Sequence, residues 1–349
     1  MKNWKKLKEN QELWKIHDVR EAVIDVIRVF FKRQDFREGF TPILVPVPSA
    51  ESNLEVFETE LRSLKGDKRR GFLIMSPEYS LKKLMAAGSG NIFEITKCFR
   101  NEEEVSESHN PEFTMLEWYR IGTDYKTIME DMESLFTEIA VKLDAQTELK
   151  KWKYQGEEYD LSTPWTRISV AEAFEKYAGI DIESLLDKEK LFFKALEKGY
   201  MVDEKSTWEQ IFYQIFFNEI EPRLKDSHRP IFVYDYPSSQ AALSRRKASD
   251  PRFAERFEIF LAGLELGNCF SELTDSTEQK SRFEQEMILR KERGKTSYPI
   301  DTELIEALES GIPESAGIAV GVDRLVMLFS NCASISETMY FPANEIFEL

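Results

Sequence analysis

Three glutamates recur at intervals of seven residues in one largely apolar segment: Glu258, Glu265 and Glu272. On one straight strand an odd interval places neighbours on opposite faces. A chain reversal near Ala262-Gly263 would change this, because Glu258 and Glu265 could then lie opposite each other. Two carboxylates at close range repel unless a cation lies between them, and hard oxygen ligands suit Mg²⁺. Either these residues bind a metal ion, or they are solvated glutamates in a chain that has 63 acidic residues.

A second candidate site lies on an expected strand over residues 112–120. The alternation of an extended chain places one set of its side chains on a single face: Phe113, Met115, Glu117 and Tyr119. The other face is also largely apolar, so we expect cover on both sides. A glutamate in such surroundings is costly to bury as an ion without a partner, and Arg100 is a candidate partner. The two residues form either a structural ion pair or the floor of a site for a flat, charged ligand that stacks on Phe113.

The third candidate is the apolar ending 316–328, which contains only two charged residues, Asp323 and Arg324. Gly317 and Gly321 allow close approach of other groups to the backbone. Arg324 is expected in the first turn of a helix, where an arginine and the helix N-terminus together can hold a phosphate. Glycine-rich strand ends are also common in cores, so this pattern leaves both interpretations open.

Several familiar catalytic patterns are missing. Gly294-Lys295-Thr296 ends like a phosphate-binding loop, but Leu289 stands where that loop requires a glycine. The sequence has no GxGxxG, GxSxG, HExxH or CxxC pattern, and it has only three histidines. A multi-histidine metal site or a Ser-His-Asp triad is therefore not expected. The chemistry must rest on carboxylates, arginines and any metal ion that the carboxylates bind.

Hydrophobic periodicity predicts the elements that would position these residues. Apolar residues at steps of three and four predict an amphipathic helix over about 12–34, and Ser76-Pro77-Glu78 reads as a helix start with Gly88 as its stop. Strands 91–100 and 112–120 around a polar loop predict a long hairpin. The remaining expected elements are short strands at 43–45, 55–61 and 72–75, a helix at 125–145, a strand at 230–237, paired strands within 255–275, a helix at 282–293, and a strand entering a helix at 316–329.

Composition indicates a globular protein with a sizeable core. Of 349 residues, 42% are hydrophobic and 32% charged, and no repeat or linker divides the chain, which favours one domain. The net charge of −16 argues against broad binding to nucleic acid, which needs positive patches, and against an anionic membrane surface.

Cysteines and apolar stretches bear on the compartment. Three widely spaced cysteines argue against a disulfide scaffold. The N-terminus lacks the apolar run of a signal peptide, and no uncharged apolar stretch approaches the length of a membrane span. These features predict a cytoplasmic protein.

Taken together, the segments resemble the three motifs of class II aminoacyl-tRNA synthetases, specifically the lysyl branch. The first motif, about residues 20–46, is the helix that ends at Gly39-Phe40 with Pro42. The second, about 95–120, contains Phe99-Arg-Asn-Glu102 and the highly specific string His109-Asn-Pro-Glu-Phe-Thr-Met-Leu-Glu-Trp-Tyr119. The third, about 315–330, contains Gly321-Val-Asp-Arg324. The resemblance implies an α+β fold with an antiparallel β-sheet flanked by helices, as one catalytic domain over 1–349.

The first-motif helix begins almost at once, so no anticodon-binding barrel is expected before it. The chain therefore resembles the free-standing paralogue family that attaches (R)-β-lysine to a lysine of elongation factor P. Ser76-Pro77-Glu78, where the synthetases have Ala-Pro-Glu, and Ala319, where they have glycine, agree with that family, as does Glu117-Trp-Tyr-Arg120. Both Ser76 and Ala319 favour the β isomer over α-lysine, because an added methyl would crowd an α-amino group.

The resemblance implies roles for individual residues. Arg100 and Arg324 would be catalytic, with Arg100 between the amino-acid carboxylate and the α-phosphate and Arg324 at the γ-phosphate. Glu258 and Glu265 would hold Mg²⁺. ATP would be bound by Arg100, Asn101, Glu102, Asn110, Phe113, Glu265, Leu266, Gly321 and Arg324. The amino acid would be bound by Ser76, Pro77, Glu78, Glu117, Tyr119, Asn268, Glu272 and Ala319. Glu78 would take the amino group near the carboxylate, and Glu272 with Tyr119 the distal ammonium, in two separated acidic pockets.

The predicted activity is an ATP- and Mg²⁺-dependent ligase that adenylates (R)-β-lysine or lysine and transfers it to elongation factor P. A homodimer follows by analogy with the family. The loop Glu103–Ser108 departs from the family pattern, because it is one residue longer than expected and acidic where an arginine is usual. Two alternatives remain: a lysine-activating enzyme with a tRNA or small-molecule acceptor, and a catalytically silent amino-acid sensor. The net charge and the missing barrel argue against tRNA.

Overall fold

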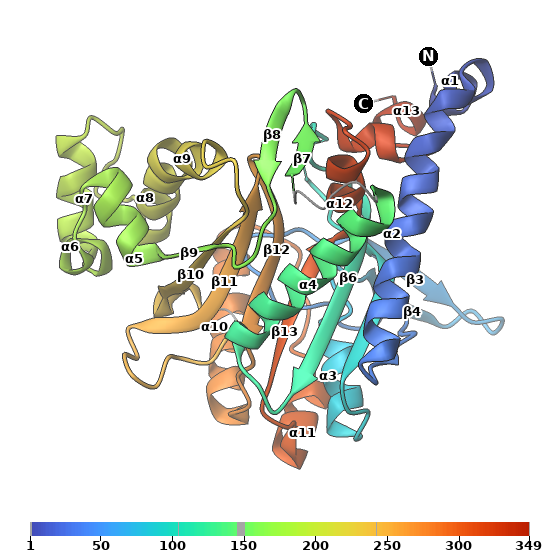
Figure 1. Ribbon diagram of the computed structural model, residues 1–349. Coiled ribbons are helices and arrows are strands. Elements are labelled where there is room, and N and C mark those ends of the chain that lie inside the picture. The colour runs from blue at the N-terminus through green and yellow to red at the C-terminus, as the bar shows by residue number, and fades with distance from the viewer. Residues whose placement is uncertain (1, 104, 145–150, 242, 349) are drawn as a thin grey trace.

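A computed structural model describes residues 2–103, 105–144, 151–241 and 243–348 of the chain. Its centre is an eight-stranded sheet in the order β1-β5-β6-β13-β12-β11-β10-β9 (Figure 1). The five inner pairs are antiparallel, while the outermost pairs, β1 with β5 and β9 with β10, are parallel. In sheet order the strands are β1 (Arg37–Glu38), β5 (Ile92–Phe99), β6 (Glu112–Ile121), β13 (Ser315–Gly321), β12 (Leu264–Ser271), β11 (Phe253–Leu261), β10 (Ile231–Pro237) and β9 (Thr166–Ser169). The predicted α+β class is confirmed, with the correction that the sheet is mixed at both edges.

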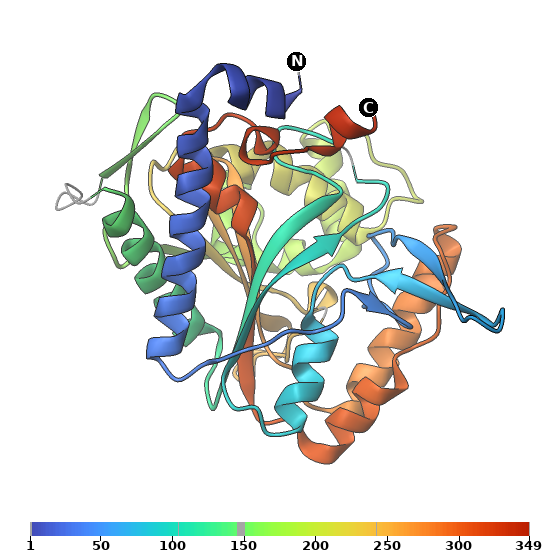
Figure 2. The same cartoon turned by 90° about the vertical axis from the view of Figure 1, so that its right-hand side faces the viewer.

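Helices cover one face of the sheet and bury the largest core. They are α2 (Trp14–Arg33), α4 (Tyr125–Leu143) and α12 (Val322–Phe329). Figure 2 shows α2 and α4 on the opposite side of the sheet from α3 (Glu78–Ala86), α10 (Ser276–Glu292) and α11 (Thr302–Gly311). Leu116 and Trp118 of β6 are fully buried in the core under α2 and α4. On the other face Met115, Glu117 and Tyr119 are each at most 5% exposed, so the prediction that β6 is covered on both faces is confirmed.

The predicted hairpin is present almost residue for residue. β5 and β6 pair antiparallel from Ile92 with Tyr119 to Phe99 with Glu112. The helices expected at 12–34 and 125–145 are also present, as is the strand-to-helix ending in β13 and α12. Position 317 has room only for glycine, because a Cβ there would lie 2.3 Å from the ring of the cross-strand partner Tyr119. The tight reversal expected near Ala262-Gly263 joins β11 to β12 with positive φ at both residues.

Other boundaries differ from the sequence prediction. The short strands expected at 55–61 and 72–75 are displaced, because β3 (Glu58–Arg62) and β4 (Lys68–Leu73) form an arm whose turn lies at 63–67. β2 (Leu44–Val45) completes this small sheet. The helix expected at 282–293 begins earlier, at Ser276, where the Asp275 side chain accepts hydrogen bonds from the amides of Thr277 and Glu278. Among the helices that were not predicted are α11 and α1 (Asn3–Glu9), which the 3₁₀ turn η1 (Gln11–Leu13) follows.

The middle of the chain forms a helical lobe with its own apolar core beside β9 and β10 (Figure 1). A hairpin of β7 (Lys151–Tyr154) and β8 (Glu157–Asp160) precedes it. Its helices are α5 (Val170–Ala173), η3 (Phe174–Ala178), α6 (Ile182–Leu186), α7 (Lys188–Glu197), α8 (Trp208–Ile215), η4 (Phe216–Ile220) and α9 (Glu221–Lys225). The remaining short helices are η5 (Ser238–Gln240), η6 (Ile335–Thr338) and α13 (Ala343–Ile346). In the described ranges, we find no helix with the length and apolarity needed to cross a membrane.

Candidate active site

A cavity of about 730 Å³ opens on the face of the sheet that the core helices leave free. Strands β6, β12 and β13 form its floor, and α3, α10 and the segment 50–53 form its walls. Most residues predicted for the site line it: Ser76, Glu78, Arg100, Asn110, Phe113, Glu117, Tyr119, Glu265, Leu266, Asn268, Glu272, Ala319, Gly321 and Arg324. Among the described residues, those predicted for the site that do not line it are Pro77, Asn101, Glu102 and Glu258. The structure thus gathers segments that are far apart in sequence around one space.

Glu117 forms a hydrogen-bonded group at one end of the cavity. Its carboxylate accepts a bond of 2.6 Å from the Ser76 hydroxyl and one of 2.5 Å from the Tyr119 hydroxyl. The Ser76 hydroxyl also accepts from the amide of Glu78 at 3.0 Å, which ties the start of α3 to β6. Burial raises the pKa of the Glu117 carboxyl to about 8, with a further rise from Glu78, although both hydroxyl donors lower it. This end of the cavity therefore holds a carboxyl group that is easily protonated.

Glu78 and Glu272 belong to the same end and are joined by a lysine. The ammonium of Lys82 lies 2.6 Å from a carboxylate oxygen of each. Burial raises the pKa of Glu272 to about 7, while Lys82 lowers it and Glu78 raises it. The other oxygen of Glu272 is buried and has no hydrogen-bond partner among the described residues. The two separated acidic pockets expected from the sequence are therefore one cluster of three carboxyl groups, because Lys82 brings Glu78 and Glu272 together.

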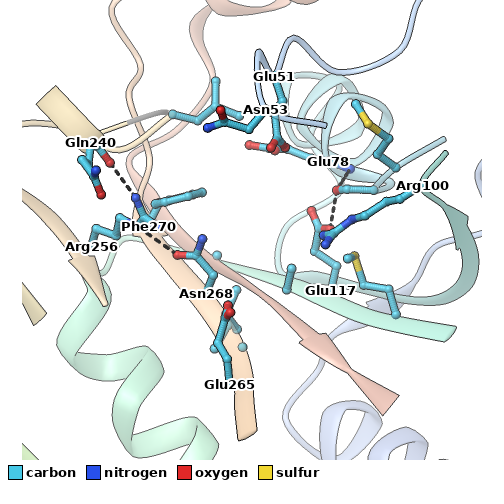
Figure 3. A pocket seen from close by; sticks show the side chains of 18 of the residues that line it. Glu51, Asn53, Glu78, Arg100, Glu117, Gln240, Arg256, Glu265, Asn268 and Phe270 are labelled. Atoms are coloured by element: carbon cyan, nitrogen blue, oxygen red, sulfur yellow. Dashed lines mark hydrogen bonds between the residues drawn. The ribbon is translucent and has the colours of Figure 1, made fainter. Parts of the chain in front are cut away.

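Arg100 does not pair with Glu117, so of the two interpretations of these residues the structural ion pair is wrong. The Arg100 guanidinium lies 5.1 Å from the centre of the Phe113 ring and 3.9 Å from the carboxylate of Glu103. Glu117 takes its hydrogen bonds from Ser76 and Tyr119 instead. Figure 3 shows Arg100 and Glu117 on the same side of the cavity. Arg100 is thus available to a ligand that enters beside Phe113.

Arg324 marks the other end, where three backbone segments meet. Its guanidinium donates to the carbonyls of Glu265 at 2.5 Å and Ser108 at 3.3 Å, and lies 2.9 Å from Nε2 of His109. The neighbouring Asp323 is buried and accepts from the amide of Thr114 at 2.5 Å. The first turn of α12 therefore fixes Arg324 against β12 and the loop that precedes β6.

Asp323 also joins the three predicted motifs. Its second carboxylate oxygen pairs with Arg20 of α2, and Arg20 donates to the Thr338 carbonyl at 3.1 Å. The amide that Asp323 accepts from belongs to β6. A single buried carboxylate thus connects the first-motif helix, the second-motif strand and the third-motif helix, and sets the position from which Arg324 projects.

The expectation that Glu258 and Glu265 lie opposite each other is wrong. Glu265 pairs with Phe260, two pairs from the turn. Beyond it the register shifts between Ile259 and Phe260 and leaves Leu266 as an extra residue, so that Glu258 pairs with Asn268. This β-bulge reverses the alternation of side chains, so that Glu265 faces the cavity with Asn268. Glu258 instead accepts from Arg256 at 2.5 Å and from the Tyr236 hydroxyl at 2.7 Å.

A divalent ion fits this end in part. Burial raises the pKa of Glu265 to about 7, Glu258 raises it further, and Arg324, Arg100 and Arg256 lower it. The Glu265 side chain has no hydrogen bond or ion pair with other described residues, so its oxygens can accept a cation. No group of three His, Cys, Asp or Glu side chains in the described ranges could hold a metal alone. The donor set therefore suits Mg²⁺ that takes most of its ligands from phosphates and water.

Three residues predicted to seat ATP have other contacts. The Asn110 side chain donates to the Glu112 carbonyl at 2.6 Å and accepts from the Ala343 amide at 3.0 Å, so it anchors the C-terminal segment. The backbone of Asn101 forms an isolated β-bridge with that of Glu55, and the carboxylate of Glu102 lies 3.5 Å from the ammonium of Lys295. Of the acidic loop 103–108, position 104 lies outside the described residues, while Glu103 lines the cavity.

Several lining residues were missed in the sequence. Arg256 donates to the Gln240 carbonyl at 2.7 Å and to Asn268 at 3.2 Å, opposite Glu78 and Arg100 across the cavity (Figure 3). Arg256 lies two residues before Glu258 on the same strand, so strand alternation could have placed both side chains on one face and indicated Arg256 as a site residue. Others come from α10, whose charged sequence gives no periodic signal, and from loops: Glu51, Ser52, Asn53, His109, Gln240, Gln279, Arg282, Phe283 and Glu286.

The cavity thus offers two chemically different ends to one ligand. Carboxyl groups from β6, from α3 and from the residue after β12 gather at one end, and guanidinium groups from β11 and α12 gather at the other. Arg100, with the Phe113 ring beside it, lies on the side of Glu117 and also acts electrostatically on Glu265. Such an arrangement can hold a molecule that is cationic at one end and anionic and aromatic at the other. It can position groups and neutralise charge without a protein nucleophile.

Comparison with known proteins agrees with this layout. The family described as tRNA synthetases class II (D, K and N) matches residues 2–345. A lysine–tRNA ligase of Pelotomaculum thermopropionicum is 38% identical over 336 residues, which cover 95% of this chain and 64% of the relative. An elongation factor P–(R)-β-lysine ligase of Mannheimia succiniciproducens is 39% identical over 326 residues, which cover 93% of this chain and 94% of the relative. A lysine–tRNA ligase of Carboxydothermus hydrogenoformans is 35% identical, with 95% and 66% covered.

Proposed function

Since this chain belongs to the class II tRNA synthetases of the D, K and N group, we propose that it is an ATP-dependent ligase that adenylates a lysine-type amino acid and transfers it to a lysine of elongation factor P. The observation that carries the proposal is the division of charge within one cavity. Three carboxyl groups (Glu78, Glu117 and Glu272) face a space that also contains Arg100, Phe113 and Arg324. A lysyl adenylate carries its ammonium groups and its phosphate in the same order.

The proposed roles follow from this layout. Glu78, Glu117 with Tyr119, and Glu272 would hold the amino groups of the substrate. Arg100 would contact the carboxylate and the α-phosphate, and Phe113 would stack on adenine beside it. Displacement at phosphorus needs positioning and charge neutralisation, so the absence of a catalytic triad from the sequence is consistent with this reaction.

Arg324 and a metal ion would neutralise the remaining phosphates. Glu265 would hold Mg²⁺, and Glu258 would join it only by releasing Arg256. When bound, the ion would add positive charge to the phosphate end, where three arginines already offset part of the rise that burial causes in the pKa of Glu265. Asn101 and Asn110 would act through the backbone that they anchor, and Glu102 through its contact with Lys295.

Two facts support a protein acceptor over a tRNA. The chain spans 64% of the length of the Pelotomaculum lysine–tRNA ligase but 94% of the Mannheimia elongation factor P–(R)-β-lysine ligase, at similar identity. The net charge of −16 gives no broad positive face for tRNA.

Ser76 and Ala319 line the pocket near Glu117. Ala319 is the cross-strand partner of Glu117, and the Ser76 hydroxyl donates a hydrogen bond to the Glu117 carboxylate. We propose (R)-β-lysine as the preferred substrate on this basis.

We also propose a homodimer through the first-motif segment. Apolar side chains there are exposed to an unusual degree: Val29 is 61% exposed and Phe40 is 84% exposed. Leu44 of the adjoining β2 and Leu64 at the tip of the β3–β4 arm are exposed as well. Large apolar side chains exposed to this degree are candidates for an interaction surface. Sedimentation should show a dimer that Phe40→Glu converts to a monomer.

Amino-acid-dependent exchange of pyrophosphate into ATP tests the activation step. We expect exchange with (R)-β-lysine well above exchange with L-lysine, (S)-β-lysine or ornithine. Labelled (R)-β-lysine should then become attached to elongation factor P but not to tRNA. Exchange with L-lysine and charging of tRNA would favour a tRNA ligase. Failure of all four amino acids would contradict the ligase and favour a catalytically silent sensor.

A further inference from the structure

Lys82 lies on the buried face of α3, and its ammonium bridges two carboxylates of the pocket. The distances are 2.6 Å to Glu78 and 2.6 Å to Glu272, and the lysine side chain is 4% exposed. Both glutamates line the cavity, whereas Lys82 does not. The ammonium therefore reaches the carboxylates from behind the cavity wall. It is a fixed internal cation at the place where substrate cations are proposed to bind.

The groups around Lys82 define the charge of this end. Glu78 comes from its own helix, Glu272 follows β12, and Glu117 with the neutral Tyr119 comes from β6. Beyond them lie Glu51 and Arg100, which carry opposite charges and act on each other electrostatically. Burial raises the pKa of Glu51; Arg100 and Arg256 lower it, and Glu78 and Glu286 raise it further. The carboxyl groups that interact with Lys82 itself are thus three, Glu78, Glu117 and Glu272, against one ammonium.

A charge count links this cluster to the substrate. When ionised, three carboxylates against one ammonium leave two negative charges, which two substrate ammonium groups would neutralise. Uncompensated charge in a buried site is costly, so the count matters. Without Lys82, a diamino acid would leave one of the three carboxylates uncompensated. With Lys82 present, a monoamino acid would likewise leave one carboxylate uncompensated.

We propose that Lys82 is a specificity-determining residue that sets at two the number of substrate ammonium groups the pocket accepts. The inference rests on the proposed function for the identity of the substrate class. It concerns the charge of the pocket and can be tested by binding alone. Lys82 acts through Glu78 and Glu272 and does not touch the reacting atoms.

Removal of the ammonium changes the proton balance of binding. The wild-type complex with a diamino acid is neutral without an added proton, so affinity should rise as the free pocket loses protons and then level off. In Lys82→Met, the complex must keep one proton on a carboxylate. Its affinity should therefore fall as the pH rises from 7 to 9, which is the opposite trend.

The test compares Lys82→Met and Lys82→Arg with Lys83→Met as the matched control. Lys83 also pairs with two carboxylates, Asp301 at 2.7 Å and Glu303 at 3.1 Å, but on the side that faces α11. Binding of L-lysine, (R)-β-lysine and norleucine is measured by calorimetry from pH 6 to 9, together with pyrophosphate exchange. For Lys82→Met we expect kcat/KM for the diamino acid to fall about 30-fold or more at pH 8, mostly in KM, with the KM for ATP unchanged. Lys82→Arg should keep the wild-type pH trend, and Lys83→Met should behave as wild type.

A second variant leaves Lys82 in place. Glu117→Gln reduces the count to one negative charge, so the preference for lysine over norleucine should drop about tenfold or more. Lys82→Met/Glu117→Gln restores the count of two and should recover affinity relative to Lys82→Met. These two variants keep the test decisive if Lys82→Met does not fold.

The inference is overturned if Lys82→Met binds diamino acids within threefold of wild type with an unchanged pH trend, or if Glu117→Gln keeps its selectivity. Equal losses in Lys82→Met and Lys82→Arg would likewise reduce Lys82 to a packing residue. Absence of exchange in the wild type contradicts the ligase alone, because calorimetry still decides on Lys82. If the wild type binds no diamino acid at all, the inference fails as well.

Discussion

The two ends of the cavity hold their charges in different ways. At the amino-acid end, Glu117 and Glu272 are almost fully buried, and burial raises the pKa of both above the ordinary range of a carboxyl group. At the phosphate end, Arg256 and Arg324 direct N–H groups to backbone carbonyls as well as to side chains. An arginine keeps its charge when buried, whereas a carboxyl group can give its charge up. The amino-acid end can therefore adjust its charge to the ligand through several groups, whereas at the phosphate end the arginines keep their charge and Glu265 is the carboxyl group whose pKa of about 7 allows such a change.

This difference has a physical consequence for binding and stability. A site for cations must keep carboxylates out of water, and the cost of doing so appears as raised pKa values. A site for phosphates can use guanidinium groups that also hold the backbone together. Loss of an arginine should therefore affect chemistry strongly at any pH. Loss of a pocket carboxyl group should have effects that depend on pH.

The largest effect is expected from Arg100→Met. Arg100 has only a distant contact with Glu103 and the ring of Phe113, so the fold should persist. Removal of a charged donor aimed at developing charge costs about 100- to 1,000-fold in rate. We expect kcat/KM for pyrophosphate exchange to fall by about that factor at every pH from 6 to 9. The measurement is initial-rate exchange with unfolding monitored by circular dichroism.

A surface arginine provides the control for that variant. Arg252 pairs with Asp250 and Glu183, and its side chain is 48% exposed. Arg252→Met should match wild type. If Arg100→Met keeps activity within threefold of wild type, the proposed role of Arg100 at the carboxylate and the α-phosphate is wrong.

The amino-acid end should show a pH dependence of intermediate size. The pKa of Glu272 is raised to about 7 and that of Glu117 to about 8, so the free pocket holds protons at pH 6. A diammonium substrate binds the ionised form. We therefore expect kcat/KM for the amino acid to rise between pH 6 and 8, by at most about tenfold per unit for each proton lost, and to level off above. Initial rates at subsaturating amino acid and saturating ATP measure it.

Two comparisons sharpen this prediction. Glu117→Gln should remove the upper step of the profile and leave the lower one. The KM for ATP should change less over the same range, since the arginines at that end keep their charge and Glu265 is the one carboxyl group named there whose pKa lies within it. A flat profile for the amino acid in the wild type would show that the carboxyl groups are already ionised at pH 6, and the proposed contrast between the two ends would fail.

Much of this site could be predicted from the sequence where local pattern and fold agree. Alternation along 112–120 placed Phe113, Met115, Glu117 and Tyr119 on the cavity face, because β6 is a regular strand between two antiparallel neighbours. Ser76 before Pro77 marked the start of α3, and its hydroxyl accepts from the Glu78 amide. Such predictions succeed because they depend on residues within a few positions of each other.

The misses have long-range causes. The bulge at Leu266 places Glu265 on the same face as Asn268 and makes Asn268, rather than Gly267, the partner of Glu258, and strand periodicity cannot show an extra residue. Ser76, rather than Arg100, is the partner of Glu117 because α3 begins beside β6 in space, 41 positions away in sequence. The bridge from Lys82 to Glu272 likewise joins α3 to the end of β12. A local sequence pattern cannot show a contact between residues that lie so far apart along the chain.

The smallest effect is expected in stability, and it concerns Glu117 itself. Its folded pKa of about 8 lies above the ordinary value of 4.5, so the ionised form is disfavoured in the folded protein. Stability that the neutral carboxyl contributes is present at low pH and is lost as the pH rises through 8. Glu117→Gln cannot ionise, and so it avoids that loss. Between pH 5 and 9, the free energy of unfolding of the variant should gain about 1–3 kcal/mol relative to wild type.

Urea unfolding at both pH values measures this gain, and Glu303→Gln, at an exposed carboxylate on α11, should show none. The hydrogen bonds from Ser76 and Tyr119 to position 117 are altered equally at both pH values, so the difference between the pH values isolates the charge. A variant that is more stable at pH 9 yet binds the diamino acid less selectively would show that the acidic end maintains a destabilising charge for the sake of its ligand. A relative loss of stability at pH 9 would mean that Glu117 is stabilised as an ion, and the contrast with the arginine end would then rest on Glu272 alone.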